Sequence, residues 1–282
     1  MPKAAVLLSA LLVLHPAAGA AGISIKLTGG LGFLSKGDYA QALRGAYDTL
    51  VGSYGTVEGE FRAFRTLTKG GLTVLVPIGS GFEIGLGAGL ERISIENRFR
   101  YSWQFVSFED AADSSLTLVP VTLDLHRRFP LGRRLSLDVF GGPGYYAVSF
   151  RHAETKGTDF FSYGEAREFT ARTGALGFQG GLSVEVALGA GLAVLIQADG
   201  RVARISALKG DLADSTSWFL GDSARPTAAA SFWAYETTSG GKTYPLGSFS
   251  AAAPSDAGLR NIREAGLDLS AFGISAGLRF RF

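Results

Sequence analysis

Two short stretches of the sequence match patterns that carry chemistry in other proteins. Residues 273–277 read GISAG, the Gly-x-Ser-x-Gly pattern of serine hydrolases. That pattern needs a strand–turn–helix, with the acid and the histidine later in the chain, and none of the residues after Ser275 is His, Asp or Glu. Residues 239–243 read SGGKT and resemble the end of a phosphate-binding loop, but Glu236 stands where the first glycine belongs. Neither stretch predicts a catalytic site.

Two histidines follow the N-terminal segment. His126 lies between Asp124 and Arg128 without a paired nucleophile, so we expect it to be a hydrogen-bonded member of a polar network. His152 lies near Ser149 and Glu154 and is the best candidate for a catalytic base. His, Asp and Glu residues show no ligand spacing, and cysteine is absent. We therefore predict a protein that is not an enzyme and uses no metal or cofactor.

The first 20 residues have the features of a secretory signal peptide. Lys3 precedes an apolar run from Ala4 to Leu14, and small residues up to Ala20 suit cleavage there. The apolar run is too short to cross a bilayer as a helix. Residues 21–282 then form one domain of nearly neutral charge, with acids and bases interspersed, which predicts no nucleic-acid binding.

Beyond the signal peptide, apolar and polar residues alternate along several stretches, and this period of two residues is typical of a β-strand. Eight such stretches are residues 23–33, 70–78, 82–92, 118–129, 135–150, 177–188, 192–205 and 267–282. Short turns and long loops alternate between them, and the long loops cover roughly residues 34–69, 102–115, 152–174 and 206–266. The sequence predicts an all-β fold: an eight-stranded antiparallel up-and-down transmembrane β-barrel with short periplasmic turns and long extracellular loops.

The first long loop should contain a short helix, because Tyr39, Leu43, Tyr47 and Leu50 would share one helical face after Asp38. The last long loop carries aromatic residues that are candidates for contacts with an extracellular ligand. They are Trp218, Phe219, Phe232, Trp233, Tyr235 and Tyr244.

The polar face of the strands distinguishes a membrane barrel from a soluble one. A water-exposed face would be rich in Lys, Glu and Thr, whereas this face mixes Gly and Ser with charges of both signs, which suits a narrow interior. Charges held there must be paired. The predicted ion-pair network of the lumen comprises Lys26, Glu83, Asp124, His126, Arg128, Asp138, Glu185, Asp199, Arg201, Arg279 and Arg281. After Glu91 and Arg92 the apolar residues change phase, which predicts a β-bulge.

The sequence resembles the small bacterial outer-membrane barrels of the OmpA/OmpX/OmpW type. The signal peptide, the eight amphipathic strands, the stretches PVTLDLHRRF and LDVFGGPGYY, and the terminal LSAFGISAGLRFRF carry the resemblance. Members of this family typically end on phenylalanine after alternating apolar residues, as Ile274, Leu278, Phe280 and Phe282 do here. The resemblance implies an outer-membrane location and recognition of this last strand by the outer-membrane assembly machinery.

Three functions follow as hypotheses. The first is a structural or surface-interaction protein, expected to be a monomer, surrounded by outer-membrane lipid and binding an extracellular ligand through its loops. The second is a narrow channel for small solutes or ions, because the lumen face is rich in glycine. The third is a lipid- or peptide-modifying enzyme centred on His152 at the rim of the barrel.

Overall fold

The computed structural model describes residues 22–54, 56–103, 106–158, 163–218 and 221–282. These residues form one helix and a 15-stranded antiparallel sheet, so the predicted number of eight strands is wrong for the sheet as a whole. The predicted signal peptide lies outside the described residues. The elements are β1 (Ser24–Leu34), α2 (Asp38–Tyr54), β2 (Val57–Glu58), β3 (Thr66–Gly79), β4 (Phe82–Trp103), β5 (Val106–Pro130), β6 (Leu135–Thr158), β7 (Tyr163–Ala187), β8 (Leu192–Ile205), β9 (Lys209–Trp218), β10 (Gly221–Ala224), β11 (Ala228–Ser239), β12 (Lys242–Ser250), β13 (Arg260–Glu264), β14 (Leu267–Asp268) and β15 (Ala271–Arg281).

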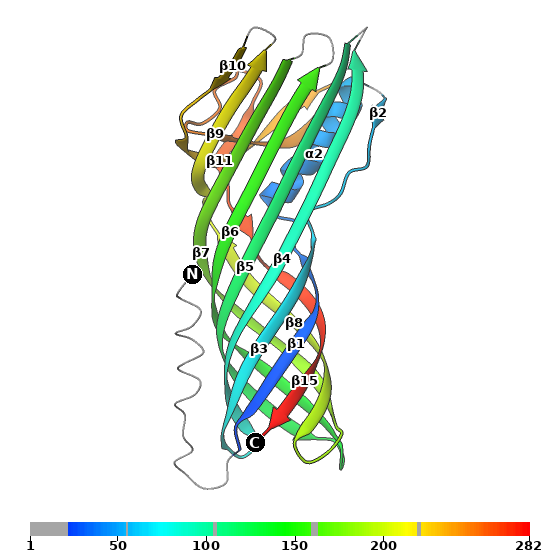
Figure 1. Ribbon diagram of the computed structural model, residues 1–282, viewed down its shortest axis with the longest axis vertical. Helices are drawn as coiled ribbons and strands as arrows, with labels where there is room; N and C mark the ends of the chain where they lie inside the picture. The colour runs from blue at the N-terminus through cyan, green and yellow to red at the C-terminus, as the bar shows by residue number, and fades with distance from the viewer. Residues whose placement is uncertain (1–21, 55, 104–105, 159–162, 219–220) are drawn as a thin grey trace.

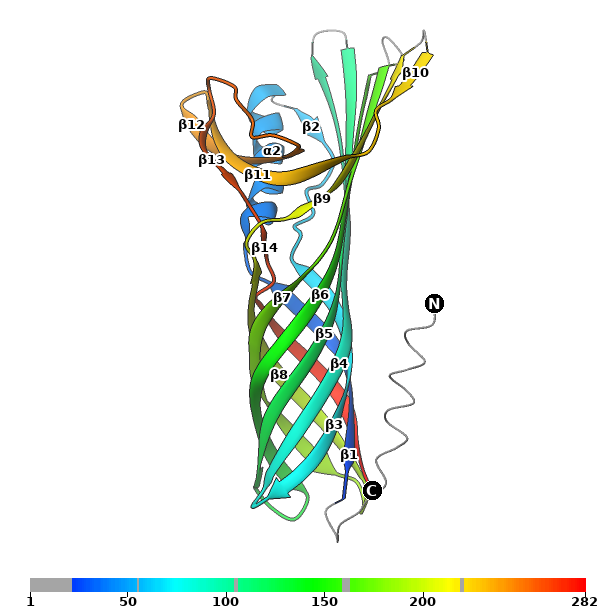
Figure 2. The ribbon, with the colours of Figure 1, turned by 90° about the vertical axis from the view of Figure 1, so that its left-hand side faces the viewer.

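Eight of the strands pair in a closed ring. The order is β1, β3, β4, β5, β6, β7, β8 and β15, and β15 pairs again with β1 from Ser24↔Arg281 to Leu34↔Ala271. A sheet closed on itself in this way is a β-barrel, and both ribbon views show its crossing front and back strands (Figures 1 and 2). Alternating side chains on every strand of the ring produce one inward and one outward face.

Tight turns join the strands at one end of the ring. The turn between β3 and β4 places Gly79, Ser80 and Gly81 at φ values of 113°, 51° and 80°, a left-handed conformation that glycine adopts at low cost. The C-terminus lies at this same end (Figure 2). The short turns predicted from the sequence are therefore confirmed.

At the other end, β4, β5, β6 and β7 continue well beyond the ring (Figure 1). β4 reaches Trp103 and β5 begins at Val106, while β6 reaches Thr158 and β7 begins at Tyr163. The predicted long loops at 102–115 and 152–174 are thus wrong, because most of their residues are strand. We call the parts of β4 to β7 beyond the ring, together with β9, the wall.

The polarity of the two faces reverses where the strands leave the ring. On β4, Leu86 and Leu90 point outward and are exposed, whereas Ile93 and Phe99 point inward and are buried. The pairing of β4 with β5 keeps one register throughout, with Ala88↔Val121 in the ring and Ile93↔Leu116 in the wall. The predicted β-bulge is therefore wrong. The apolar residues change phase because the buried side of the strand changes, not because a residue is inserted.

The residues predicted as the fourth loop form ordered structure. β11 and β12 continue the wall from β9 into a sheet that curves over the ring, with β13 beside β11 (Figure 2). The stretch SGGKT is the turn of the β11–β12 hairpin, where Gly240 and Gly241 have φ values of 56° and 76°. The prediction of a 206–266 loop is wrong, and we call the wall together with α2, β11, β12 and β13 the cap.

The helix predicted in the first loop is confirmed as α2, which packs between β12 and the wall with Tyr39, Ala42 and Gly45 buried. A single hydrophobic core joins its buried face to the wall and to the upper end of the ring. Within the described residues, no helix has the length and apolar character needed to cross a membrane.

Candidate functional site

The outer face of the ring is a belt of exposed apolar side chains. Leu86, Leu123 and Ile196 are 57%, 53% and 67% exposed. On β15 the same face carries three of the residues predicted as the assembly signal: Ile274 and Leu278 are exposed and Phe280 is partly buried. The fourth, Phe282, directly follows the strand and is exposed. The opposite, inward face of these strands carries the charges.

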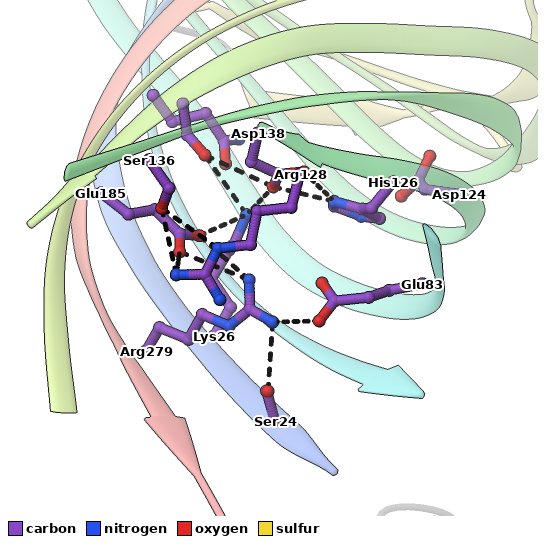
Figure 3. A network of polar contacts seen from close by, with 12 residues as sticks. Ser24, Lys26, Glu83, Asp124, His126, Arg128, Ser136, Asp138, Glu185 and Arg279 are labelled. Atoms are coloured by element: carbon purple, nitrogen blue, oxygen red, sulfur yellow. Dashed lines mark hydrogen bonds and ion pairs between the residues drawn. The ribbon is translucent and has the colours of Figure 1, made fainter. Parts of the chain in front are cut away.

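Glu185 lies at the centre of the lower lumen and is fully buried. Four cationic side chains surround its carboxylate, and Figure 3 labels three of them, Lys26, Arg128 and Arg279. Their nitrogen–oxygen distances are 3.2 Å for Arg279, 3.3 Å for Arg128, 3.3 Å for Arg281 and 3.8 Å for Lys26. Because one carboxylate pairs with cations from different strands, it holds opposite sides of the ring together.

Asp138 and Glu83 complete the lower network. Asp138 accepts hydrogen bonds from Lys26 Nζ at 2.8 Å and from His126 Nδ1 at 3.0 Å, and the His126 ring stacks on Phe140. Glu83 pairs with Arg279 at 2.5 Å. Eight of the predicted lumen residues are therefore brought together here: Lys26, Glu83, His126, Arg128, Asp138, Glu185, Arg279 and Arg281.

The three remaining predicted lumen residues lie higher. Asp124 accepts hydrogen bonds from Thr122 and Gln179, both at 2.9 Å. Asp199 pairs with Lys69 at 2.5 Å, and Arg201 pairs with Glu91. The lumen thus holds two charged layers with the Asp124 group between them.

Lys69 and Glu91 were missing from the predicted network. Lys69 was overlooked because the strand was started at Gly70, after the lysine, although the alternation of β3 continues through it. Glu91 lies inside the predicted strand 82–92, next to the predicted bulge, and its place on the inward face was the signal that could have found it. In the structure both residues continue the inward face of their strands, and extending the alternation of β3 by one residue would have found Lys69.

An apolar cluster lies directly above the charged layers. Its members point inward from different sides of the ring, are no more than 4% exposed, and belong to the core shared with the cap: Leu34, Leu67, Leu118, Tyr146 and Leu269. The guanidinium of Arg201 lies 5.2 Å from the centre of the Tyr146 ring, so the cluster and the upper charged layer are in contact. We call this cluster the lid.

Aromatic rings form the core of the cap. Tyr39 packs edge-on against Phe150 at 5.0 Å and Phe232 at 5.7 Å, and Phe169 stacks on Phe249 at 4.2 Å. Sequence reasoning missed this cluster, because all of its rings except that of Phe150 lie in segments predicted as long loops.

The aromatic residues predicted as loop contacts have different environments. Phe232 is 1% exposed, so it belongs to the core. Trp233 is half-buried, and its indole donates a hydrogen bond to the Ser250 carbonyl at 3.2 Å. Tyr244 is partly covered by α2, where its hydroxyl faces Gly52. Phe219 and the side chain of Trp218 lie outside the described part of the chain.

His152 points into the cap and has two hydroxyl partners. Its Nδ1 lies 2.9 Å from the Tyr39 hydroxyl and 3.0 Å from the Ser114 hydroxyl, and these hydroxyls lie 2.5 Å apart. Burial lowers the pKa of His152, so the ring is held neutral, and burial likewise raises the pKa of Tyr39. Ser149, the partner suggested by the sequence, lies on the opposite face of β6.

A cavity of about 380 Å³ lies between α2, the wall, β11 and β12. Tyr39 and His152 form part of its lining, together with Tyr235 and a charged row near its mouth. Ser114 does not line the cavity and is 1% exposed. Among the described residues, His, Asp and Glu form no group of three that could hold a metal ion.

No model of a known protein family matches the chain, and no curated protein matches it. Solved structures to which the chain has a distant likeness include a major outer membrane protein of Thermus thermophilus, with 13% identity and a TM-score of 0.41 over 93% of this chain and 100% of that one. The outer membrane protease OmpT of Escherichia coli has 13% identity and a TM-score of 0.27 over 95% and 99%. The translocator domain of the autotransporter NalP of Neisseria meningitidis has 12% identity and a TM-score of 0.19 over 99% and 95%. This protein is an antiparallel β-barrel with a cap, and these likenesses are too distant to define its activity.

Proposed function

We propose that the protein is a non-enzymatic outer-membrane β-barrel whose ring lies in lipid and whose cap binds a partner outside the cell. The reversal of polarity at the top of the ring carries this proposal. Below it, apolar side chains such as Leu123 face outward, and above it polar side chains such as Arg151 and Glu168 do so. A continuous apolar belt of this kind is stable in hydrocarbon and a liability in water.

The closed lumen supports an interaction role over a transport role. Ion pairs fill both charged layers, and the lid covers the upper one with buried apolar side chains. An ion passing the lid would lose its water of hydration without a polar replacement. Binding through the cap is the function that this arrangement leaves, since loops and added elements carry function on rigid scaffolds.

The same proposal names the partners of the ring. The belt runs around all eight strands, so outer-membrane lipid surrounds a monomer. The outward-facing residues of β15, ending in Phe282, are the segment read by the outer-membrane assembly machinery. We propose no enzymatic role because Ser114 is buried below the surface of the cavity, out of reach of a substrate.

The first test places an arginine in the belt. Leu123→Arg should lower the free energy of unfolding from lipid vesicles by about 2–4 kcal/mol, because its charge would lie in the hydrocarbon. Ser94→Arg is the matched control, since Ser94 is exposed on the outer face of the wall, and its effect should stay within about 0.5 kcal/mol. Urea titration of vesicle-inserted protein measures both. Equal effects of the two substitutions would contradict the proposed position of the membrane.

The second test is the conductance of residues 21–282 refolded into a planar bilayer. We expect no current steps above baseline, while heat-dependent migration on gels verifies that the barrel is folded. The physical reason is the succession of ion pairs and lid along the lumen. Steady, reproducible openings would contradict the closed lumen and support the alternative of a narrow channel.

A further inference from the structure

The concave inner face of the cap carries two charged rows, which the strand register sets side by side. One row is Glu154, Arg167 and Asp214, paired across β6, β7 and β9. The next row is Asp110, Lys156 and Glu165, across β5, β6 and β7. The two rows contain four carboxylates and two cations, so the face has an excess of negative charge.

Both cations of these rows already have carboxylate partners. Lys156 Nζ lies 2.9 Å from Glu154, and Arg167 lies 3.5 Å from Asp214. Asp110, in contrast to Glu154 and Asp214, has no cationic partner in any ion pair between described residues. Its carboxylate accepts a hydrogen bond from the Tyr101 hydroxyl at 3.2 Å.

The environment of Asp110 is unfavourable for a lone carboxylate. The residue is half-buried, and burial raises its pKa above the ordinary value even though Lys156 acts in the opposite direction. Tyr101, its hydrogen-bond partner, is 8% exposed and stacks on Tyr54 at 4.4 Å. A positive charge in contact with Asp110 would offset this cost.

The cavity beside Asp110 offers room for such a charge and for an apolar body attached to it. Its volume of about 380 Å³ suits a small molecule. Aromatic side chains contribute much of its lining, among them Tyr47, Phe61, Phe99, Phe169, Tyr235 and Phe249. Electron-rich ring faces attract cations as well as apolar groups.

The wall of this cavity is held in place by specific contacts. Asn97 is 2% exposed, accepts a hydrogen bond from the Arg62 backbone N–H at 2.6 Å and donates one to the Arg62 carbonyl at 3.3 Å. These bonds hold the segment that carries Phe61 against α2. The rings of Phe61 and Tyr47 stack there, with their centres 5.5 Å apart. The cavity is therefore preformed, which lowers the entropic cost of binding.

We propose that this cavity binds a small primary amine with an aromatic or apolar body, whose ammonium group contacts Asp110 while its body packs among the rings. The proposal rests on the proposed function of the cap and names the chemical class of its partner. Of the four charged residues that line the cavity, Glu154, Lys156 and Arg167 each take part in an ion pair, which leaves the Asp110 carboxylate as the charge available to a ligand. An anionic ligand is disfavoured because both cations of the lining are paired.

The test measures binding of phenethylamine to the full-length mature protein in detergent micelles by isothermal titration calorimetry. The charge-reversed probe is 3-phenylpropionate, which has a similar body. We expect saturable binding of the amine and none of the acid. Asp110→Asn should weaken amine binding at least tenfold, because it removes the charge but keeps an acceptor for Tyr101.

Asp113→Asn is the matched control, since Asp113 lies on the same strand but on the exposed outer face. It makes the same change of net charge and should alter amine binding less than twofold. Ala112→Leu, which fills the cavity while keeping Asp110, should also weaken binding. Equal binding by wild type and Asp110→Asn, or tighter binding of 3-phenylpropionate, would overturn the proposal. Failure of amine binding alongside a silent bilayer and a destabilised Leu123→Arg would overturn the amine alone and leave the barrel function standing.

Discussion

Glu185→Gln should lower the free energy of unfolding by about 3–5 kcal/mol, the cost of breaking a buried ion pair by removing one partner. Glu185 is fully buried and lies within 3.8 Å of four cationic groups, those of Lys26, Arg128, Arg279 and Arg281. Glutamine preserves the shape of the side chain but leaves these cations with one negative charge fewer. Urea unfolding of the vesicle-inserted protein measures the loss.

Glu168→Gln provides the matched control. Glu168 lies on the same strand, β7, but pairs with Arg151 at 2.6 Å on the exposed face, where the two side chains are 45% and 51% exposed. Such surface pairs contribute about 0.2–1 kcal/mol. If Glu185→Gln is no more harmful than Glu168→Gln, the lower lumen is hydrated and the charges do not depend on one another.

The ring and the faces of its strands were predictable because each strand of a barrel has one environment inside and another outside. Alternation alone placed Glu83, Asp138 and Glu185 on the inward face. It could not decide which cation meets which carboxylate, since those pairs join strands that are far apart in the sequence, as in Lys26–Asp138, which are 112 positions apart. Pairing across the lumen is decided by the closure of the ring.

The wall was not predictable by the same rule, because the rule assumes that the apolar face stays on one side. Where β4 leaves the ring, Leu90 faces outward and Ile93 inward without any shift of register. A sequence with such a reversal resembles a bulge followed by a loop. The signal that could have distinguished them is the unbroken period of two from Ile93 through Phe99 and Tyr101, which continues in the new phase.

The cap could not be predicted from the sequence for a different reason. β9, β11 and β12 are polar on one side, and their apolar partners lie on α2 and on the wall, far away in sequence. Tyr39 on α2 meets His152 on β6 and Phe249 on β12. Contacts of this range depend on the position of the wall, so they could be inferred only after the wall was known.

The interface between α2 and β12 leads to the second large effect. In the interior of a helix, replacing glycine by alanine normally stabilises by about 0.5–1 kcal/mol. At Gly45 the sign should reverse, because an added Cβ would lie 1.7 Å from the Pro245 carbonyl oxygen. Gly45→Ala must push α2 away from β12, and we expect a loss of about 1–3 kcal/mol in the stability of the docked helix. Hydrogen exchange of the α2 amides measures this loss as an acceleration of about tenfold or more.

Gly52→Ala in the same helix is the control that separates helix propensity from docking. Its Cβ would meet only the hydroxyl of Tyr244, at 3.1 Å, and that hydroxyl is the far end of a side chain that can rotate. We expect slower or unchanged exchange of the α2 amides, because the gain in helix propensity is retained. If Gly45→Ala also slows exchange, α2 is not held against β12. In that event the cavity between α2 and the wall would lack a fixed boundary. Amine binding would then carry the additional entropic cost of ordering the helix.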